Sequence, residues 1–204
     1  MSRIILLVEG QTEETVLPEF FGRWLSRRLD APPALHPVNL KGAGNYLKSY
    51  VQRAVRWLES GKAAGVAGIL DFHGARFDFP EGASTIEQKY EWAKQRLEAA
   101  VGDARFRQHF AVHETEAWLL SDPSILPPEV RPHVPDLPPE EVDFEDPPSK
   151  RLSRWYRTLL GKSYKKVIDG HRLFSQLDPE RAAERCPHLR LLLEDLLGLA
   201  GGDV

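Results

Sequence analysis

The sequence predicts an α/β protein with a central, mostly parallel sheet flanked by helices, followed by a small helical C-terminal subdomain. Two apolar segments, Ile4–Val8 and Ala64–Leu70, are too short for core helices and suit strands buried on both faces. Longer segments with apolar residues at helical spacing separate them, and strands that alternate with helices form parallel sheets. Each of the two apolar segments ends at an acidic residue, Glu9 or Asp71.

Two weaker strands complete the predicted sheet. The segment Leu35–Leu40 is a weak strand, and Pro37 places it toward an edge because proline cannot donate to the ladder. Phe110–Val112 is a short fourth strand that runs directly into His113-Glu-Thr-Glu116. Between the strands, the glycine-containing stretch 41–45 is favoured as a plain connecting loop over a phosphate cradle, because two glycines alone are weak evidence.

Helix boundaries follow from capping signals. Thr12 is the predicted N-cap of the first helix, and Pro18 either marks the true start of that helix near Leu17 or kinks it. Ser84-Thr-Ile-Glu87 has the form of a capping box before a helix that continues to Val101. Ser149 is the predicted cap of a basic helix that ends near Gly161.

The amino-acid composition of the chain changes after residue 122. Residues 123–148 contain nine of the sixteen prolines and read as an irregular surface excursion, not a core element. Tyr164-Lys-Lys166 is predicted to form a turn or short strand, Asp178-Pro179 starts a helix, and a final amphipathic helix continues through Leu197. The predicted units are residues 1–122, the α/β core; 123–148, the excursion; and 149–204, a basic helical subdomain packed on the core.

Length and composition restrict the class of protein. A chain of 204 residues fits one domain with an appended subdomain, and it contains neither an apolar run long enough to span a bilayer nor a signal-peptide pattern. With Cys186 as the only cysteine, no internal disulfide is expected, so we expect a cytoplasmic protein. The net charge of -3 conceals an asymmetry: residues 113–148 hold ten acids and one arginine, whereas residues 149–176 hold eight Lys or Arg and one acid.

Acidic residues follow three of the predicted strands. Because the carboxyl ends of parallel strands lie on one edge of a sheet, Glu9, Asp71, Glu114 and Glu116 are expected in one neighbourhood. Clustered carboxylates repel one another and are usually held by a hard divalent cation, here Mg²⁺ or Mn²⁺. Glu116 is the better ligand of its pair because Glu114 is a candidate cap; Glu13 is a further candidate ligand, although its place in a first helical turn favours a role at the helix dipole.

The basic segment offers a candidate substrate surface. Its cations lie among Trp155, Tyr156 and Tyr164, and positive charge interleaved with aromatic rings suits a nucleic-acid backbone. The alternative is a solvated helix face whose aromatic residues belong to the core. The residues expected to bind nucleic acid are Lys150, Arg151, Arg154, Lys165 and Lys166.

Several motifs together resemble a known family. Val8-Glu-Gly-Gln-Thr-Glu13 looks like the first motif of TOPRIM domains, the metal-binding fold of topoisomerases, DnaG-type primases and overcoming-lysogenization-defect nucleases. More specifically, the chain resembles the bacterial domain-of-unknown-function 4276 family over nearly its full length. This resemblance rests on Asp71-Phe-His-Gly74, Asp78-Phe-Pro80, His113-Glu-Thr-Glu-Ala-Trp-Leu-Leu120, Pro148-Ser-Lys-Arg151, Tyr164-Lys-Lys-Val-Ile-Asp-Gly170 and Cys186-Pro-His-Leu189. It implies a TOPRIM-like fold, and a setting beside ABC-type ATPases suggestive of phage defence.

One departure from the TOPRIM pattern concerns His73. TOPRIM domains carry an Asp-x-Asp pair after the third strand, and here His73 stands at the second position. This histidine either leaves a single carboxylate there, with Glu114 or Glu116 compensating, or is itself a nitrogen ligand that favours Mn²⁺. A loop histidine with local hydrogen bonds is an equally good interpretation, and it leaves open a catalytically silent domain.

The sequence therefore predicts a TOPRIM-like, metal-dependent phosphodiesterase that cuts DNA or RNA, with a partner ATPase in phage defence. Glu9, Asp71 and Glu116 are the predicted catalytic metal ligands, Glu114 supports them, and Lys165 stabilises phosphate charge. The alternatives are a non-catalytic regulatory subunit of an ABC-type ATPase and a small-nucleotide phosphoesterase. No membrane partner is expected, and self-association is left open.

Overall fold

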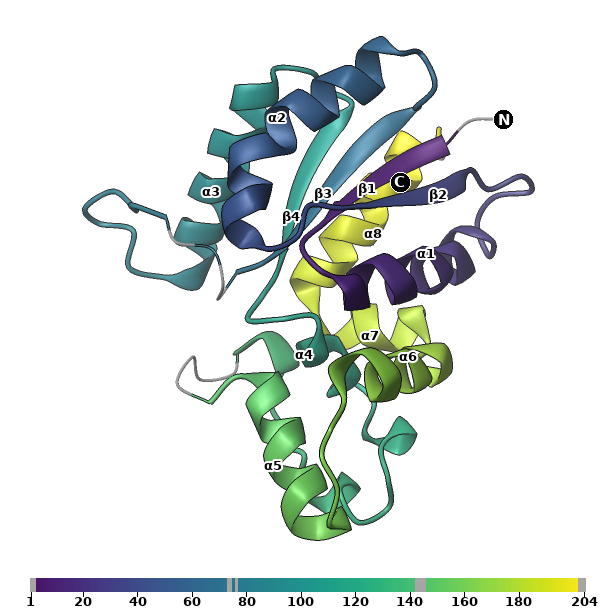
Figure 1. The fold of residues 1–204 in the computed structure, drawn as a ribbon, viewed down its shortest axis with the longest axis vertical. Coiled ribbons are helices and arrows are strands. Elements are labelled where there is room, and N and C mark those ends of the chain that lie inside the picture. Colours follow the sequence, from purple (N-terminus) through teal and green to yellow (C-terminus); the bar gives the residue numbers. More distant parts are fainter. Residues whose placement is uncertain (1–2, 73–74, 76, 142–145, 202–204) are drawn as a thin grey trace.

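A four-stranded parallel sheet organises the molecule (Figure 1). The computed structural model describes residues 3–72, 75, 77–141 and 146–201. The strands are β1 (Arg3–Val8), β2 (Ala34–Asn39), β3 (Gly65–Asp71) and β4 (Phe106–Ala111), in the order β2-β1-β3-β4 with all pairs parallel. The predicted α/β class with a parallel sheet is confirmed, and the arrangement is Rossmann-like.

The sheet is covered by helices on both faces, because every side chain of its central strand β1 from Ile4 onward is apolar. One face carries Ile4, Leu6 and Val8 and packs against α1 (Gln11–Leu25) and α8 (Pro187–Leu199). The other face carries Ile5 and Leu7 and packs against α2 (Ala43–Glu59) and α3 (Ile86–Val101). All five of these β1 side chains are fully buried, as a strand between two helical layers requires.

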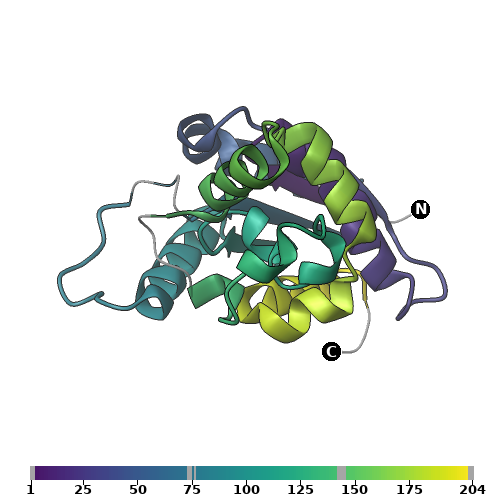
Figure 2. The same cartoon turned by 90° about the horizontal axis from the view of Figure 1, so that it is seen from below.

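The remaining elements form a lobe at the carboxyl edge of the sheet. Seen from below, they lie in front of the strands (Figure 2). They are α4 (Glu116–Leu119), three 3₁₀ turns (Pro123–Ile125, Arg131–His133 and Pro139–Glu141), α5 (Pro148–Leu160), α6 (Lys166–Gln176) and α7 (Pro179–Arg185). Trp118 of α4 anchors the lobe. Its ring is fully buried, and the centroid of that ring lies within 6.4 Å of the ring centroids of Phe20, Phe21 and Phe174.

Strand positions agree with the sequence in outline. The strand β2 lies at an edge of the sheet, as Pro37 predicted, and Pro37 pairs in register with Leu6. The strand β4 begins at Phe106, four residues before the predicted start, because Gln108 and His109 are buried although they are polar. Gln108 is satisfied there by the hydroxyl of Tyr46, which donates to its Oε1 at 2.8 Å.

Three predicted caps were wrong. Gly10, not Thr12, precedes the first turn of α1, and Thr12 lies inside the helix, which continues through Pro18. The capping box of α3 is shifted by one residue, since the Thr85 side chain accepts from the backbone N–H of Gln88. Ser149 lies within α5 and caps nothing with its side chain.

Two features of the C-terminal half were not predicted. The excursion 123–148 contributes to the core, because Leu126 and Val130 are fully buried there. Lys166, expected in a turn or short strand, is the first residue of α6, which packs its Leu173 and Phe174 into the core beside α1. Among the helices that the structure describes, none is both long and apolar enough to cross a membrane.

Candidate active site at the carboxyl edge of the sheet

The strand order places a crevice beside Glu9 and Asp71. From β1 the chain moves to β2 on one side and later to β3 on the other, so the order reverses at the carboxyl ends of β1 and β3, where α/β proteins bind ligands. Glu9 follows β1, and Asp71 is the last residue of β3. Both line a cavity of about 410 Å³, together with Glu13, Lys41 and Lys166 among others. The sequence-based expectation that these strand ends meet is confirmed.

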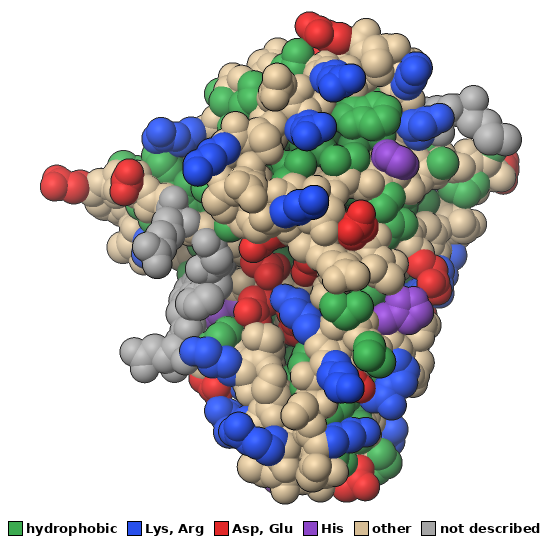
Figure 3. Space-filling model, in the orientation of Figure 1, with side chains coloured by type: hydrophobic (Ala, Val, Ile, Leu, Met, Phe, Trp, Pro, Cys, Tyr) green, Lys and Arg blue, Asp and Glu red, His purple; other side chains and the backbone are tan. Residues whose placement is uncertain are grey.

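The ammonium group of Lys166 lies among three carboxylates. Its Nζ is 3.1 Å from Oε2 of Glu116, 3.7 Å from Oδ2 of Asp71 and 3.9 Å from Oε1 of Glu13. The carboxylate side chains are only 1%, 14% and 6% exposed, whereas that of Lys166 is 38% exposed. Figure 3 shows this arrangement as acidic side chains gathered in a hollow with a basic side chain beside them.

Thr115 orients two of these carboxylates. Its backbone N–H donates to Oδ1 of Asp71 at 3.1 Å, and its hydroxyl donates to Oε1 of Glu13 at 3.2 Å. Gly10 gives Glu13 the room it needs, because a Cβ at residue 10 would lie 2.8 Å from Oε2 of Glu13. Glu116 is fixed differently, as the first residue of the short helix α4 whose next three side chains are all buried.

Glu114 has a different role from its neighbour. Its Oε2 accepts a hydrogen bond of 3.0 Å from the backbone N–H of Ser149, in the first turn of α5. A carboxylate at this position accepts a hydrogen bond from a backbone N–H that has no partner within the helix, and its negative charge interacts favourably with the positive end of the helix dipole. Glu114 therefore caps another helix, in line with its sequence-based assignment as a capping candidate.

Two buried carboxylate oxygens have no partner among the described residues. They are Oε2 of Glu9 and Oε1 of Glu116, whereas Oε2 of Glu116 lies 3.1 Å from the Lys166 ammonium. A buried oxygen without a partner is costly, and in native proteins it usually indicates a bound water or ion. Glu9 and Glu116 therefore each keep one unsatisfied acceptor oxygen at this edge of the sheet.

Burial and mutual repulsion shift the protonation of these groups. Burial raises the pKa of Glu116 to about 7, although the nearby Lys166 ammonium opposes the shift. Burial also raises the pKa of Asp71 well above its usual value, and that of Glu9 in the same direction. The pKa of Lys166 is raised because the attraction of Glu116, Asp71 and Glu13 outweighs the effect of burial. Burial and mutual repulsion thus disfavour the charged forms of these carboxyl groups, and the Lys166 ammonium only partly offsets this.

Backbone strain also gathers at this edge. Among the described residues, only Lys41 and His113 are non-glycine residues with positive φ, at 62° and 65°. Lys41 lines the cavity, and His113, fully buried, directly precedes the segment that carries Glu114 and Glu116. Such conformations are uncommon outside glycine and concentrate at functional sites.

The carboxylates fit a hard divalent cation in donor type. No group of three or more His, Cys, Asp or Glu side chains within the described ranges is arranged as a ready-made metal site, and the Lys166 ammonium lies where three carboxylates converge. The donors are nevertheless all oxygens, and two of them, Oε2 of Glu9 and Oε1 of Glu116, lack partners among the described residues. His73, the candidate nitrogen ligand, lies outside the described residues.

The other basic residues named from the sequence lie away from the carboxylates or are paired. Arg151 and Arg154 both form ion pairs with Asp146, at 3.1 Å and 2.7 Å. Lys150 is exposed on α5, and Lys165 is exposed at the start of α6, where its backbone N–H donates to Asp169. The lysine that reaches the carboxylates is Lys166, one residue after the predicted Lys165.

Three site residues were not found from the sequence. Thr115 lies between the two glutamates that were singled out, and it orients Asp71 and Glu13. Asn39 ends β2 and lines the cavity, where its amide donates to Oε2 of Glu14 at 3.0 Å. Lys41 follows two residues later. Asn39 could have been predicted, because it is a polar residue at the end of a strand, and this pattern predicted Glu9 and Asp71.

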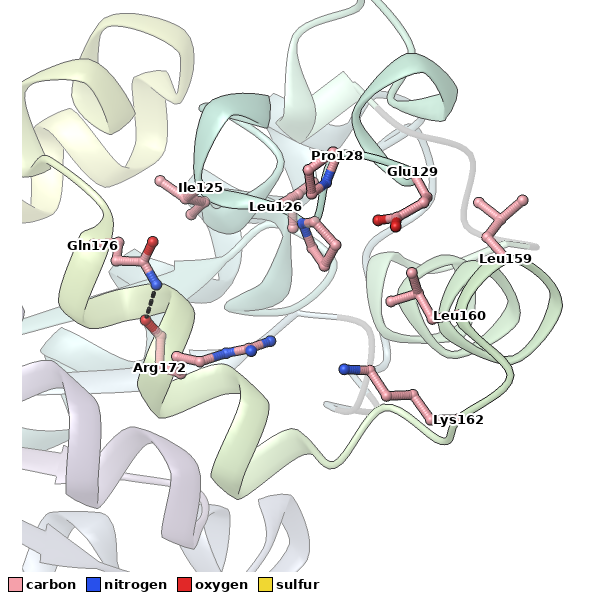
Figure 4. A pocket seen from close by; sticks show the side chains of 10 residues that line it. Ile125, Leu126, Pro128, Glu129, Leu159, Leu160, Lys162, Arg172 and Gln176 are labelled. Carbon is pink, nitrogen blue, oxygen red and sulfur yellow. Dashed lines mark hydrogen bonds between the residues drawn. The ribbon is translucent and has the colours of Figure 1, made fainter.

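A second cavity, of about 570 Å³, lies in the lobe (Figure 4). Its lining is mixed: the apolar side chains of Ile125, Leu126, Leu159 and Leu160 line it together with the charged groups of Glu129, Lys162 and Arg172. The guanidinium of Arg172 donates to Asp169 and to the hydroxyl of Tyr156, so this cation is already engaged. The cavity contains none of the carboxylates at the sheet edge.

Comparison with known families identifies the chain. The model of the family described as "Domain of unknown function (DUF4276)" matches residues 8–197. The chain belongs to the DUF4276 family. Comparison with curated proteins gave no match, and comparison with solved structures gave none.

In this DUF4276 protein, several of the segments on which the resemblance rests meet at the sheet edge. Asp71 lies at the cavity, the segment 148–151 begins the helix that Glu114 caps, and the segment 164–170 carries Lys166 to the carboxylates. The segment 186–189 begins α8, where Oε2 of the buried Glu140 accepts from the backbone N–H of His188 at 2.8 Å.

Proposed function

We propose that this protein is a divalent-metal-dependent phosphodiesterase that cleaves DNA or RNA. The observation that carries the proposal is the group of four acidic side chains at the topological switch point of the sheet, Glu9, Glu13, Asp71 and Glu116, with two buried oxygens that lack a partner among the described residues. Lys166 pairs with Glu13, Asp71 and Glu116, and one ammonium cannot neutralise three carboxylates. A further cation at this edge offsets the remaining charge.

Glu9, Asp71 and Glu116 are the residues that would hold Mg²⁺ or Mn²⁺, with Glu13 as a further ligand. Bound there, the ion supplies Lewis-acid polarisation of a phosphoryl oxygen and a water of lowered pKa. The site resembles a TOPRIM centre in having acids at the ends of neighbouring parallel strands, and the TOPRIM relation is part of the proposal.

Lys166 has the position and freedom to bind phosphate. It begins α6, its side chain is 38% exposed, and its ammonium is held by charge attraction to three carboxylates, not by a single bidentate partner. With those carboxylates held by a cation, the Lys166 ammonium would be free to contact a phosphate oxygen. Charge stabilisation of the phosphate, which the sequence assigned to Lys165, is therefore proposed for Lys166.

The experiment compares Glu9→Gln, Asp71→Asn and Glu116→Gln with the wild type. Mn²⁺ and Mg²⁺ binding is measured by calorimetry, and cleavage of single-stranded DNA, duplex DNA and RNA is measured in the same samples. We expect each variant to lose both binding and cleavage, and Glu9→Gln to keep the wild-type melting temperature. Full cleavage by Glu9→Gln would refute the ligand assignment.

Glu14→Gln is the matched control. Glu14 lies beside Glu13 in the first turn of α1, but its carboxylate accepts from Asn39 and does not line the cavity. Its conversion to an amide should leave metal binding and cleavage unchanged, which separates loss of a ligand from a general change in charge.

The Lys166 ammonium also supports a second function. A cluster of carboxylates that is already neutralised in part by an internal ammonium does not require a metal ion. It is therefore compatible with a non-catalytic domain that regulates a partner, such as an ABC-type ATPase. This alternative predicts a stable complex with the ATPase on gel filtration, without cleavage of any nucleic acid by either protein or by both together.

A further inference from the structure

The outer face of α2 carries an unusual group of side chains. The helix buries Tyr46, Tyr50, Ala54 and Leu58 against the sheet, so its opposite side faces solvent. On that side a cavity of about 450 Å³ is lined by Arg53, Arg56, Trp57, Ser60 and Lys62. We refer to Arg53, Arg56, Trp57 and Lys62 as the α2 basic surface.

The cations of this surface are not neutralised by the part of the chain that the structure describes. None of the side chains of Arg53, Arg56 and Lys62 forms an ion pair within 4.0 Å of a described carboxylate. On α5, by contrast, two of the arginines share Asp146. The α2 basic surface therefore keeps its charge available for an anionic partner.

An aromatic wall distinguishes this surface from an ordinary solvated helix face. Trp57 is only partly buried and lines the cavity together with the cations. The ring of His36, on the edge strand β2, lies 5.6 Å from it at an interplanar angle of 60°. An indole held in this way, beside several cations, can stack on a nucleobase while the cations contact neighbouring phosphates.

The α2 basic surface is connected to the carboxylate site by the helix itself. Lys41 and Gly42 line the carboxylate cavity, and α2 begins at Ala43. Arg53 and Arg56 lie ten and thirteen residues after Ala43, so the two sites are separated by about 15–20 Å along the helix. Figure 3 shows basic side chains over the upper part of the same face that presents the acidic hollow.

We propose that the α2 basic surface binds single-stranded nucleic acid, with a base stacked on Trp57 and phosphates on Arg53, Arg56 and Lys62. The strand follows α2 and reaches the carboxylates past Lys41. A single strand fits better than a duplex, because its bases are exposed for stacking. The proposal rests on the proposed function for the fate of the strand, but the binding itself is independent of cleavage.

The test measures binding by fluorescence anisotropy in EDTA, where metal-dependent cleavage is absent. The probes are 20-nucleotide, 5′-fluorescein-labelled single-stranded DNA and RNA of mixed sequence, and a 20-base-pair duplex. The full-length wild type is compared with Arg53→Glu/Arg56→Glu, and with Arg157→Glu/Lys162→Glu, the α5 variant, as a control of equal charge change at the C-terminal end of α5. Both pairs are exposed, so both variants should fold.

We expect the α2 variant to bind single strands at least tenfold more weakly than the wild type, and the α5 variant less than threefold more weakly. The slope of log K against log salt concentration should fall by about 1.4 in the α2 variant, since two phosphate contacts are removed. Trp57→Leu should lose roughly tenfold in affinity, whereas Trp57→Phe, which keeps a stacking ring, should lose much less.

Equal losses in the two charge variants, unchanged binding by the α2 variant, or tighter binding to the duplex would each overturn the proposal. Cleavage with Mn²⁺ is assayed separately. A wild type that binds single strands through α2 but cleaves nothing contradicts the proposed function and leaves the binding surface intact. Cleavage that persists at the wild-type rate in the α2 variant, with unchanged binding, overturns the binding surface alone.

Discussion

Removing the Lys166 ammonium is the most informative perturbation of the carboxylate site. In Lys166→Met the stem of the side chain is kept, and three buried carboxylates lose the cation that lies 3.1, 3.7 and 3.9 Å away. These carboxylates then repel one another with nothing between them. The variant should be less stable than the wild type wherever the carboxylates are ionised.

The distances give the magnitude. At an effective dielectric constant near 20, each attraction at about 4 Å contributes roughly 4 kcal/mol before desolvation is subtracted. Removing one partner of a buried pair typically costs about 3–5 kcal/mol, and the 38% exposure of Lys166 calls for a discount for solvent screening. We therefore expect a loss of about 2–3 kcal/mol at pH 8, or roughly 5–10 °C in melting temperature.

The loss should depend on pH in a defined direction. The pKa of Glu116 is raised to about 7 in the fold, from an ordinary value of 4.5, so between these pH values the native state binds more protons than the unfolded state. Stability contributed by this group therefore falls as pH rises through that window. Without Lys166 the fall is larger, so the penalty of Lys166→Met should be greater at pH 8 than at pH 6.

A double-mutant cycle measured by urea unfolding tests the reasoning. Glu116→Gln removes the carboxylate nearest to the ammonium, so Lys166→Met should cost about 1 kcal/mol less in that background than in the wild type. The single variant Lys166→Met should bind Mn²⁺ more tightly than the wild type, because the competing internal cation is gone. A variant as stable as the wild type at pH 8, or equal losses in both backgrounds, would show that Lys166 does not neutralise these carboxylates.

Three further predictions concern groups away from the site. Burial lowers the pKa of His109, whose Nε2 lies 3.0 Å from Asp195, to about 4. As the pH drops from 6.5 towards 4, the unfolded state therefore binds a proton before the native state does, and the stability of the protein falls. Calorimetric melting of His109→Gln should show a flatter dependence of stability on pH over that range. In Gly68→Ala the added Cβ would meet the hydroxyl of Tyr46 in the core, with an expected cost of about 1–3 kcal/mol by urea unfolding. Gly22→Ala, inside α1 with open space at its Cβ, should instead stabilise by up to about 1 kcal/mol, and a loss there would contradict the packing described.

The sequence was sufficient for the sheet and for most of its site. Short apolar strands ending in acids are a local pattern, and parallel alternation with helices brings those ends to one edge whatever the details of packing. Glu9, Asp71 and Glu116 were named on this basis, and the structure brings them to the same edge. The metal and nucleic acid predicted for them stay predictions.

Helix ends were less predictable, because several caps come from distant residues. The first turn of α5 is capped by Glu114, thirty-five positions earlier in the chain, and that of α8 by Glu140, forty-eight positions before His188. Local capping patterns at Ser149 and Thr12 therefore misled. Only the folded chain shows which carboxylate reaches which helix end.

What the sequence alone determined is the fold class and the acids at the strand ends, because strand burial and strand order depend on short-range patterns of apolar residues. Only the tertiary structure decided that Lys166, and not Lys165, enters the acidic group, since this depends on how α6 packs on α1. It also decided that the cations of α2 remain available while two on α5 are paired, because ion pairs are set by distances between side chains that the order of residues does not reveal.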